Sequence, residues 1–348
     1  MSVDLSKLAV KRKLAIEELN GRRVAIDAYN VLYQFLSIIR QPDGTPLMDR
    51  KGNVTSHLSG LFYRTIELVD KGVKPLYVFD GIPSMLKQKT IQARMKSREK
   101  ALEAWHKAKE AGEAEEARKY AQASTRINRY IVESSKTLLR LMGIPQVPAP
   151  SEGEAEACHL CRKGVVYAAA SQDYDTLLFG SPLIVRNLTL SGKRKLPGKN
   201  VYVNVEPEIV SLEDTLRGVG VSQRQLIWIG ILLGTDFNEG ISGVGPKTAV
   251  KIAKEARSIS DIKDYVKKKY NAEFELDIAS VEDLFTNPEV SDMSQEELES
   301  MESMPDKESI IGFMCGEHGF SEERVSKFVD RLAGKRSTAR QHTIEKWL

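Results

Sequence analysis

The stretch AAASQDYDTLLF (168–179) decides the expected fold, because an apolar strand ends here in two carboxylates, Asp173 and Asp175. The apolar residues VVYAAA (165–170) predict a buried strand just before them. Upstream, APSEGEAEA (149–157) opens a helical pattern that carries Glu152 and Glu154. In open α/β sheets the functional crevice lies beyond the carboxyl ends of the strands. We therefore expect these four carboxylates to converge there.

Two earlier strands are expected to end in the same way. RRVAIDAYNVL (22–32) predicts a strand that ends at Asp27, before a helix that begins near Asn30, and KPLYVFDG (74–81) predicts one that ends at Asp80. A further acid, Asp236 in GILLGTDFNEG (230–240), follows an apolar helix. One Asp after a strand is usually a turn residue. Seven acids at element ends indicate a shared site instead: Asp27, Asp80, Glu152, Glu154, Asp173, Asp175 and Asp236.

Carboxylates that lie close together raise one another's pKa unless a cation neutralises them. Oxygen ligands in such numbers suit Mg²⁺ or Mn²⁺ rather than Zn²⁺, so the sequence predicts a magnesium site. The alternative for one part of it is a capping box, in which Ser151 and Glu154 satisfy free amides at a helix start.

Composition limits the class of protein. The chain has 348 residues, 41% of them hydrophobic, and contains no apolar run of membrane-spanning length. The first residues lack the apolar core of a signal peptide, so we expect a cytoplasmic, nucleoid-associated protein without membrane contact. Three cysteines are too few for a disulfide framework, and the pair Cys158 and Cys161 is expected to be structural.

The charge is unevenly distributed. Residues 271–308 hold 13 of the 48 acidic residues and one of the 51 basic residues, which leaves 35 acidic and 50 basic residues, a net charge of +15, elsewhere. A basic body favours a polyanionic partner such as nucleic acid. The acidic stretch 271–308 is expected to be a solvated, helix-rich insertion.

A long polar helical segment extends from Pro83 to about Leu141, directly after the strand that ends at Asp80. Lys87 and Arg94 lie seven residues apart on it and so share one helix face. The simpler interpretation is a solvated charged helix. Because the segment leaves the sheet beside the acids, its cations are instead expected to overhang them and clamp a scissile phosphate. The stretch AGEAEEA (111–117) lets the chain fold back as a second helix.

Beyond the acids, LIVRNLTLSG (183–192) and KNVYVNVEP (199–207) predict strands joined by the loop GKRKLPGK (192–199). ISGVGPKTAVKIAKE (241–255) follows, a glycine-rich turn that opens a helix at Pro246. It lacks the adjacent Gly-Lys of a nucleotide-binding loop. An ordinary helix start is one interpretation; the other is a grip on the phosphate backbone. The residues expected to contact DNA are Gly243, Gly245, Lys247 and Thr248.

The chain closes with GKRSTARQHTIEKWL (334–348), a basic linker followed by apolar residues. Their spacing of i, i+3, i+6 and i+7 places Gln341, Ile344, Trp347 and Leu348 on one side of a short turn. C-terminal tails are usually disordered and without a specific role, but an exposed aromatic side chain often fills a pocket on a binding partner.

These motifs together resemble the flap endonucleases of the archaeal and eukaryotic type, over nearly the whole chain. The matching blocks, in order, are IDAYNVLYQFL (26–36), VTSHLSGLFYRT (54–65), YVFDG (77–81), PSEGEAEA (150–157), ASQDYDTLLFG (170–180) and GTDFNEGISGVGPKTA (234–249). The resemblance implies an α/β fold with a central, mainly parallel twisted sheet flanked by helices, a helical arch over the active site, and a helix-two-turn-helix motif that binds duplex DNA.

The resemblance also implies the activity: hydrolysis of a phosphodiester where a 5′ single-stranded flap meets a duplex, with 5′–3′ exonuclease activity, in replication and repair. It implies two Mg²⁺ ions, replaceable by Mn²⁺, one held by Asp80, Glu152 and Glu154 and the other by Asp175 and Asp236. Asp173 would lie between the ions, and Asp27 would act through water.

Further roles are implied in the same way. Lys87 and Arg94 would contact the scissile phosphate, and Tyr33 would stack on a nucleobase beside it. The turn 240–245 would hold K⁺ through backbone carbonyls, although Gly240 stands where some members offer a hydroxyl. The C-terminal tail would bind the sliding clamp (PCNA), and the chain alone would be a monomer.

The expected organisation is one nuclease domain, residues 1–333, and a flexible tail, residues 334–348. Within the domain lie an N-terminal region (about 1–100), the arch (about 83–130), an internal region (about 131–260) and the acidic region (271–308). Three rival functions remain. A clamp-tethered DNA-binding module has no use for seven acids, an aspartyl phosphatase wants an Asp where Tyr29 stands, and related excision-repair nucleases carry a longer arch insertion.

Overall fold

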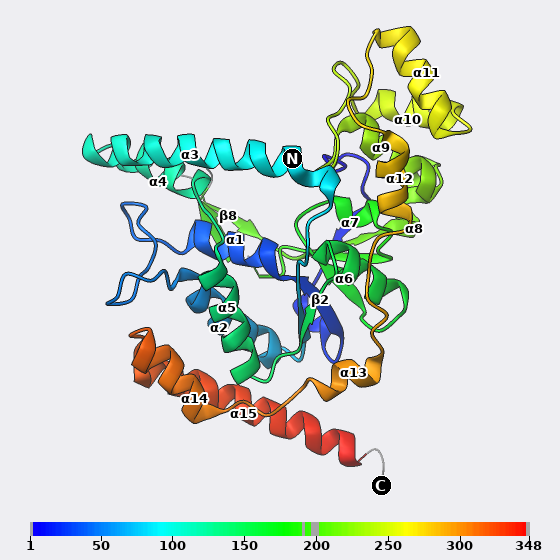
Figure 1. The fold of residues 1–348 in the computed structure, drawn as a ribbon. Coiled ribbons are helices and arrows are strands. Elements are labelled where there is room, and N and C mark those ends of the chain that lie inside the picture. The colour runs from blue at the N-terminus through cyan, green and yellow to red at the C-terminus, as the bar shows by residue number, and fades with distance from the viewer. Residues whose placement is uncertain (1–2, 190–191, 196–201, 346–348) are drawn as a thin grey trace.

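The computed structural model describes residues 3–189, 192–195 and 202–345 (Figure 1). Within them a seven-stranded sheet has the order β1-β9-β6-β5-β2-β3-β4. The pairs β2–β3, β2–β5, β3–β4 and β5–β6 are parallel, whereas β9 runs antiparallel to β1 and β6. The strands are β1 (Lys11–Lys13), β2 (Arg23–Asp27), β3 (Lys74–Phe79), β4 (Gln146–Pro148), β5 (Ala168–Ala170), β6 (Leu183–Arg186) and β9 (Glu208–Ser211). The expectation of a central, mainly parallel sheet is confirmed.

Helices cover both faces of this sheet. They are α1 (Ala28–Ile38), α2 (Ser56–Asp70), α3 (Gln88–Glu110), α4 (Ala114–Ala123), α5 (Arg129–Leu141), α6 (Gly153–Arg162), α7 (Asp175–Leu178), α8 (Leu212–Val219), α9 (Gln223–Leu233), α10 (Pro246–Glu255), α11 (Ile259–Tyr270), α12 (Ile278–Thr286), α13 (Gln295–Ser300), α14 (Lys307–Ile311) and α15 (Glu322–Glu345). Short turns of helix, η1 (Ile16–Leu19), η2 (Met85–Lys87) and η3 (Gly312–Glu317), join them.

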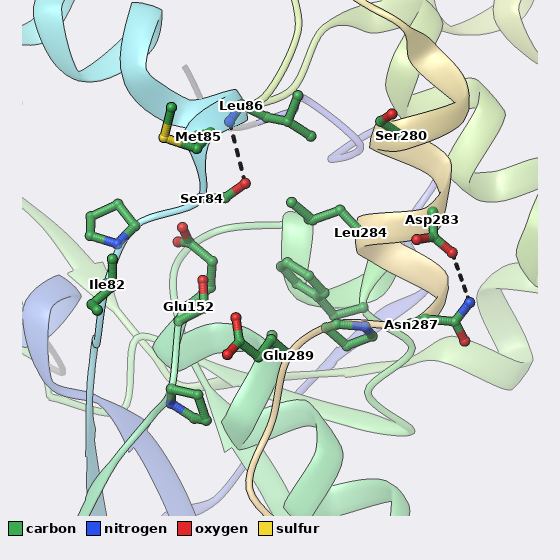
Figure 2. Close-up of a pocket in the computed structure, with 16 residues that line it drawn as sticks. Ile82, Ser84, Met85, Leu86, Glu152, Ser280, Asp283, Leu284, Asn287 and Glu289 are labelled. Carbon is green, nitrogen blue, oxygen red and sulfur yellow. Dashed lines mark hydrogen bonds between the residues drawn. The ribbon is translucent and has the colours of Figure 1, made fainter.

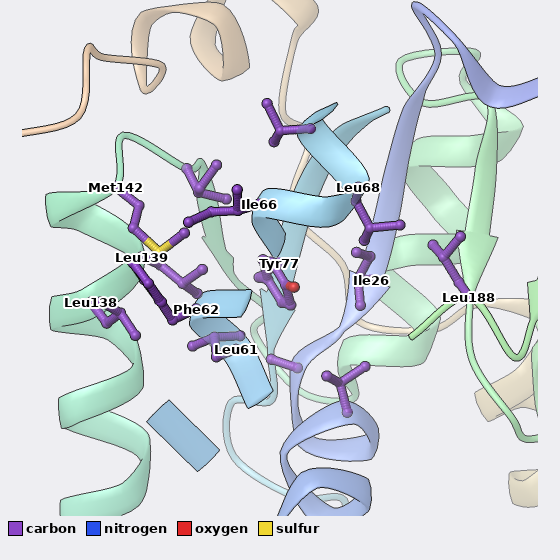
Figure 3. Packing of buried hydrophobic residues seen from close by; sticks show 14 of the residues in the cluster. Ile26, Leu61, Phe62, Ile66, Leu68, Tyr77, Leu138, Leu139, Met142 and Leu188 are labelled. Carbon is purple, nitrogen blue, oxygen red and sulfur yellow. The ribbon is translucent and has the colours of Figure 1, made fainter. Parts of the chain in front are cut away.

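The central strands are buried on both faces, and alternate residues enter different cores. Ile26 and Tyr77 face the cluster formed with α1, α2 and α5, whereas Ala25 and Leu76 face the cluster formed with α6. Figure 3 shows the first core, where Phe62 of α2 and Leu139 of α5 lie beside Tyr77. Strands buried in this way leave their carboxyl ends as the part of the sheet where polar side chains can be placed.

A further core forms around α9, whose residues Leu226–Leu232 are all buried. Ile278, Val281 and Phe285 of α12 belong to this core and are fully or almost fully buried. The expectation that residues 271–308 form a merely solvated insertion is therefore wrong. Of the two acidic residues of α12, Asp283 is exposed, whereas Glu282 is buried and accepts hydrogen bonds from Arg224 and Trp228 of α9. The apolar side of α12 seals α9 against solvent.

One local prediction is also wrong. Residues Gly192–Lys195, expected in a loop, form strand β7, which pairs with β8 (Tyr202–Val205) in a separate two-stranded sheet. The predicted strand 199–207 contains β8, and the chain returns to the main sheet with β9, which follows it. Pairing of this kind depends on distant partners, which local alternation does not reveal.

The predicted flexible tail begins too early. Helix α15 continues to Glu345, so residues 334–345 are helical. Arg336 is anchored, because its guanidinium donates to Glu302 Oε2 at 3.1 Å and to the Gly143 carbonyl at 3.1 Å. Glu302 also pairs with the buried Arg23 at the start of β2. Of the expected clamp-binding residues, Gln341 and Ile344 lie on the helical backbone, and Trp347 and Leu348 lie outside the described residues.

The polar segment after β3 is helical and folds back on itself, as expected. Helix α3 runs away from the sheet, and α4 folds back alongside it after Gly112, which has a φ of +75° (Figure 1). Among the described helices, none combines the length and the apolar character that crossing a membrane requires.

Candidate active site

Two glycines bring the ends of β3 and β4 together. A Cβ on Gly81 would lie 2.2 Å from the Ala149 carbonyl oxygen, and a Cβ on Gly153 would lie 2.6 Å from Asp80 Oδ1. In the space left free, the Gly153 amide donates to Asp80 Oδ1 at 2.8 Å. Asp80 is thereby held at the start of α6, beside Glu152.

Asp27 and Asp173 are joined through Asn30. Asp27 caps α1 by accepting the Asn30 amide at 3.0 Å, and the Asn30 side chain donates to Asp173 Oδ2 at 3.1 Å. Strands β2 and β5 are direct neighbours, so one polar side chain on α1 spans the ends of both.

The other three acids complete the cluster. Asp175 begins α7 and accepts the Val3 amide at 3.0 Å. Glu154 accepts a hydrogen bond from the Ser171 hydroxyl, and Asp236 follows α9 in a turn that Asn238 closes. The structure therefore brings all seven predicted acids to one edge of the sheet. Ser151 forms no capping box, because the N-cap of α6 is Glu152, without a side-chain cap.

Burial and mutual repulsion disfavour the ionised acids. Burial, with repulsion from Asp80 and Asp173, raises the pKa of Asp27 to about 8. Burial and repulsion from Asp236 raise the pKa of Asp175 to about 7. Burial also raises the pKa of Asp80 to about 6, and burial with repulsion from Asp173 holds the pKa of Glu154 well above its ordinary value.

The two arch cations reach into this cluster, as the sequence led us to expect. Lys87 pairs with Glu152, and Arg94 donates to Asp236 Oδ1 at 2.5 Å. Burial opposes ionisation of Asp236, but Arg94 and Lys87 outweigh it and lower the pKa of this acid. Two cations face seven carboxyl groups, so full ionisation of the acids would leave an excess of five negative charges.

The donor set suits divalent cations, although within the described residues no three His, Cys, Asp or Glu side chains already form a metal shell. One buried oxygen, Glu152 Oε1, has no hydrogen-bond partner. An uncompensated carboxylate oxygen inside a cluster of acids is costly unless a cation approaches it. The hard oxygen donors match Mg²⁺ and Mn²⁺.

The remaining predicted residues surround this cluster at a distance. Tyr33 lies on α1 with the Arg98 guanidinium 5.6 Å from its ring centre. Gly245 is the N-cap of α10 with Pro246 in the first turn, Gly243 has a φ of +81°, and Lys247 is exposed. Thr248, also in the first turn of α10, is partly exposed.

Gly240 is required by its surroundings. A Cβ there would lie 2.3 Å from the Leu233 carbonyl oxygen and 2.7 Å from the Gly234 amide. The turn after α9 therefore has no room for a hydroxyl-bearing side chain at this position.

Two family models match most of this chain. The XPG N-terminal domain model matches residues 4–101, and the XPG I-region model matches residues 143–236. A Flap endonuclease 1 of Thermococcus onnurineus is 51% identical over 348 residues, which cover 100% of this chain and 99% of the relative. The chain belongs to the flap endonuclease family. It is therefore a nuclease, a hydrolase that acts on DNA.

Solved structures agree with this family. Flap endonuclease-1 from Methanococcus jannaschii superposes with a TM-score of 0.75 at 39% identity, covering 97% of this chain and 99% of that one. The catalytic core of Rad2, solved in complex with a DNA substrate, gives a TM-score of 0.68 at 25% identity, with 94% and 97% covered.

Sequence reasoning missed two residues that organise the site, Asn30 and Ser171. Asn30 links two acids, and the Ser171 hydroxyl lies next to Glu154 while accepting the Asp173 amide at 3.1 Å. For Asn30 a signal was available, since it stands three residues after Asp27, where a capping acid finds its amide. Ser171 offered none, because its partner Glu154 belongs to another element.

Proposed function

We propose that this chain is an Mg²⁺-dependent endonuclease that cuts DNA near the junction of a 5′ flap with duplex, and that it also degrades DNA from 5′ ends. The observation that carries the proposal is the convergence of seven acids beneath Lys87 and Arg94. Such an activity serves Okazaki fragment maturation and repair.

Two neighbouring pairs guide the division of the metal donors; Glu154 is assigned by the family resemblance, since its charged neighbours are Asp173, Asp27 and Asp175. Asp80 lies beside Glu152, and Asp175 lies beside Asp236. We assign Asp80, Glu152 and Glu154 to one Mg²⁺ and Asp175 and Asp236 to the other. Asp173 then lies between the ions, and Asp27 acts through water. When bound, two such ions supply an activated water and neutralise charge on the attacking and leaving oxygens.

Lys87 and Arg94 act on the phosphate. With the acids neutralised by bound divalent ions, these two side chains would be free to donate to the oxygens of the scissile phosphate. Burial opposes the charge on Lys87, but Glu152 and Asp80 raise its pKa, so Lys87 is protonated in the metal-free site. A fixed positive charge that meets developing negative charge favours the transition state over the ground state.

DNA contacts extend from this centre on two sides. Tyr33 is assigned to stack on a nucleobase beside the scissile phosphate. The turn at Gly243 and Gly245 presents backbone amides and the exposed Lys247 to duplex phosphates, with Thr248 in the first helical turn. K⁺ held by carbonyls of residues 240–245 would stiffen this turn. The catalytic core of Rad2, which has a similar fold, was solved in complex with a DNA substrate, and this supports a DNA-binding surface on this fold.

The C-terminal residues Gln341, Ile344, Trp347 and Leu348 are assigned to a sliding clamp (PCNA), with Trp347 as the anchor. The nuclease alone is proposed to be a monomer located in the cytoplasm at the nucleoid.

Cleavage of matched substrates tests this function. A labelled duplex with a 5′ flap is compared with a 3′-flap duplex and a blunt duplex of the same sequence, in Mg²⁺, in Mn²⁺ and in EDTA. We expect cutting near the 5′-flap junction in either metal and none in EDTA. Equal cutting of the 3′-flap substrate, or cutting in EDTA, would refute the proposal.

A further inference from the structure

A pocket opens at the Glu152 end of the acid cluster (Figure 2). One wall is the segment Ile82–Leu86, which joins β3 to α3, and the other is α12 with Leu284 and Asn287. The volume is about 510 Å³, within the range of small-ligand pockets. Glu152 lines the pocket and also pairs with Lys87, so the pocket directly adjoins the candidate active site.

The lining favours a neutral, partly apolar occupant. At the rim, Ile82 is 82% exposed and Met85 is 76% exposed, so two apolar side chains are turned to water side by side with an open cavity. Asp283 and Glu289 add negative charge to that of Glu152. Phosphate groups would be repelled, whereas a flat ring with polar edges would bury the apolar side chains and find hydrogen-bonding groups.

The position of the pocket beside Lys87 indicates which nucleobase of the DNA could enter it. Lys87 follows Leu86 of the pocket wall, so a phosphate held by Lys87 places its neighbouring nucleotide within reach of Ile82–Leu86. Tyr33 lies on α1, which follows β2, whereas Glu152 follows β4, with β3 between these strands. The pocket and Tyr33 therefore follow strands that are not neighbours in the sheet.

We propose that this pocket binds the nucleobase of the unpaired flap nucleotide next to the scissile phosphate. The proposal rests on the flap cleavage proposed above and adds a base-binding subsite on the flap side of the cut. Cleavage then depends on the presence of a base at this one position, and the backbone of the flap alone is not sufficient for the full rate.

Single-turnover cleavage with a modified flap tests this dependence. The flap nucleotide at the cut carries either a normal base or an abasic analogue, and a second substrate carries the analogue five nucleotides further out. We expect the adjoining abasic site to slow the parent roughly fivefold or more, the lower end of base stacking, and the distant one to have no effect.

Variants of the pocket residues test whether the slower cleavage of the abasic flap arises from the pocket. The double variant Ile82→Ala/Met85→Ala should cut the normal flap about as slowly as the parent cuts the abasic flap, and should lose nothing more on the abasic flap. Met304→Ala, 40% exposed and outside the pocket lining, is the control and should match the parent. Equal parent rates on normal and abasic flaps, or additive losses in the double variant, would overturn the subsite. Absence of any flap cleavage would instead refute the proposed function.

A binding measurement in EDTA gives a readout without cleavage. A 2-aminopurine base at the adjoining flap position should change its fluorescence on binding to the parent and to Met304→Ala. The change should be smaller with Ile82→Ala/Met85→Ala. An identical signal for all three proteins would contradict the pocket assignment.

Discussion

Replacing Asp175 by Asn in metal-free protein should stabilise the fold. Burial and Asp236 raise the pKa of Asp175 from 3.8 to about 7, a rise of about three pKa steps at about 1.4 kcal/mol each. The raised value means that the unfolded state ionises first, so the parent loses stability as pH rises from about 4 to about 7. Asn carries no charge and can still accept the Val3 amide. The gain at pH 8 therefore has a ceiling of about 4 kcal/mol.

The assay is urea unfolding in EDTA at pH 4 and pH 8, for the parent, Asp175→Asn and Asp277→Asn. Asp277 is an exposed control for which the expected change in stability has the opposite sign. Its hydrogen bond with Lys263 lowers its pKa, so the Asn variant should be less stable than the parent at pH 8. The Asp175→Asn gain should be present at pH 8 and nearly absent at pH 4. A variant no more stable than the parent at pH 8 would refute the electrostatic reasoning.

Three further predictions concern the arch, a glycine and the tail. Lys87→Ala and Arg94→Ala should lower the single-turnover rate far more than DNA affinity; an intact saturated rate with a higher dissociation constant would move both residues to general phosphate binding. Gly153→Ala should cost about 1–3 kcal/mol in unfolding and lower cleavage, since its Cβ would lie 2.6 Å from Asp80 Oδ1; a result equal to Gly316→Ala, which has open space, would contradict this. Deleting residues 341–348 should leave clamp-free cleavage unchanged and abolish clamp stimulation; equal stimulation of parent and truncation would exclude the tail as anchor.

Much of the site could be predicted from the sequence, because strand ends are a local feature. Asp27, Asp80 and Asp173 each follow a short apolar run, and parallel strands place such positions on one edge. The contact of Lys87 and Arg94 with the acids was predictable as well, although Lys87 ends η2 and Arg94 lies on α3, which follows it directly.

What the sequence did not reveal depends on distant contacts. Strand β7 carries three charged residues, and its pairing with β8 is set by a partner several residues away. The burial of α12 depends on α9 beside it, and residue 336, expected in a flexible tail, is held in α15 by the contact of Arg336 with Glu302. Charge counting treated residues 271–308 as solvated because it contains no information about neighbours.

The central claim is that the seven acids bind two divalent ions, and the most direct measurement is the number of ions bound. Calorimetric titration of metal-free protein with Mn²⁺, without DNA, should give two ions per chain for the parent and a lower number or affinity for Asp80→Asn and for Asp236→Asn. Unchanged binding in both variants, or no binding by the parent, would contradict the account.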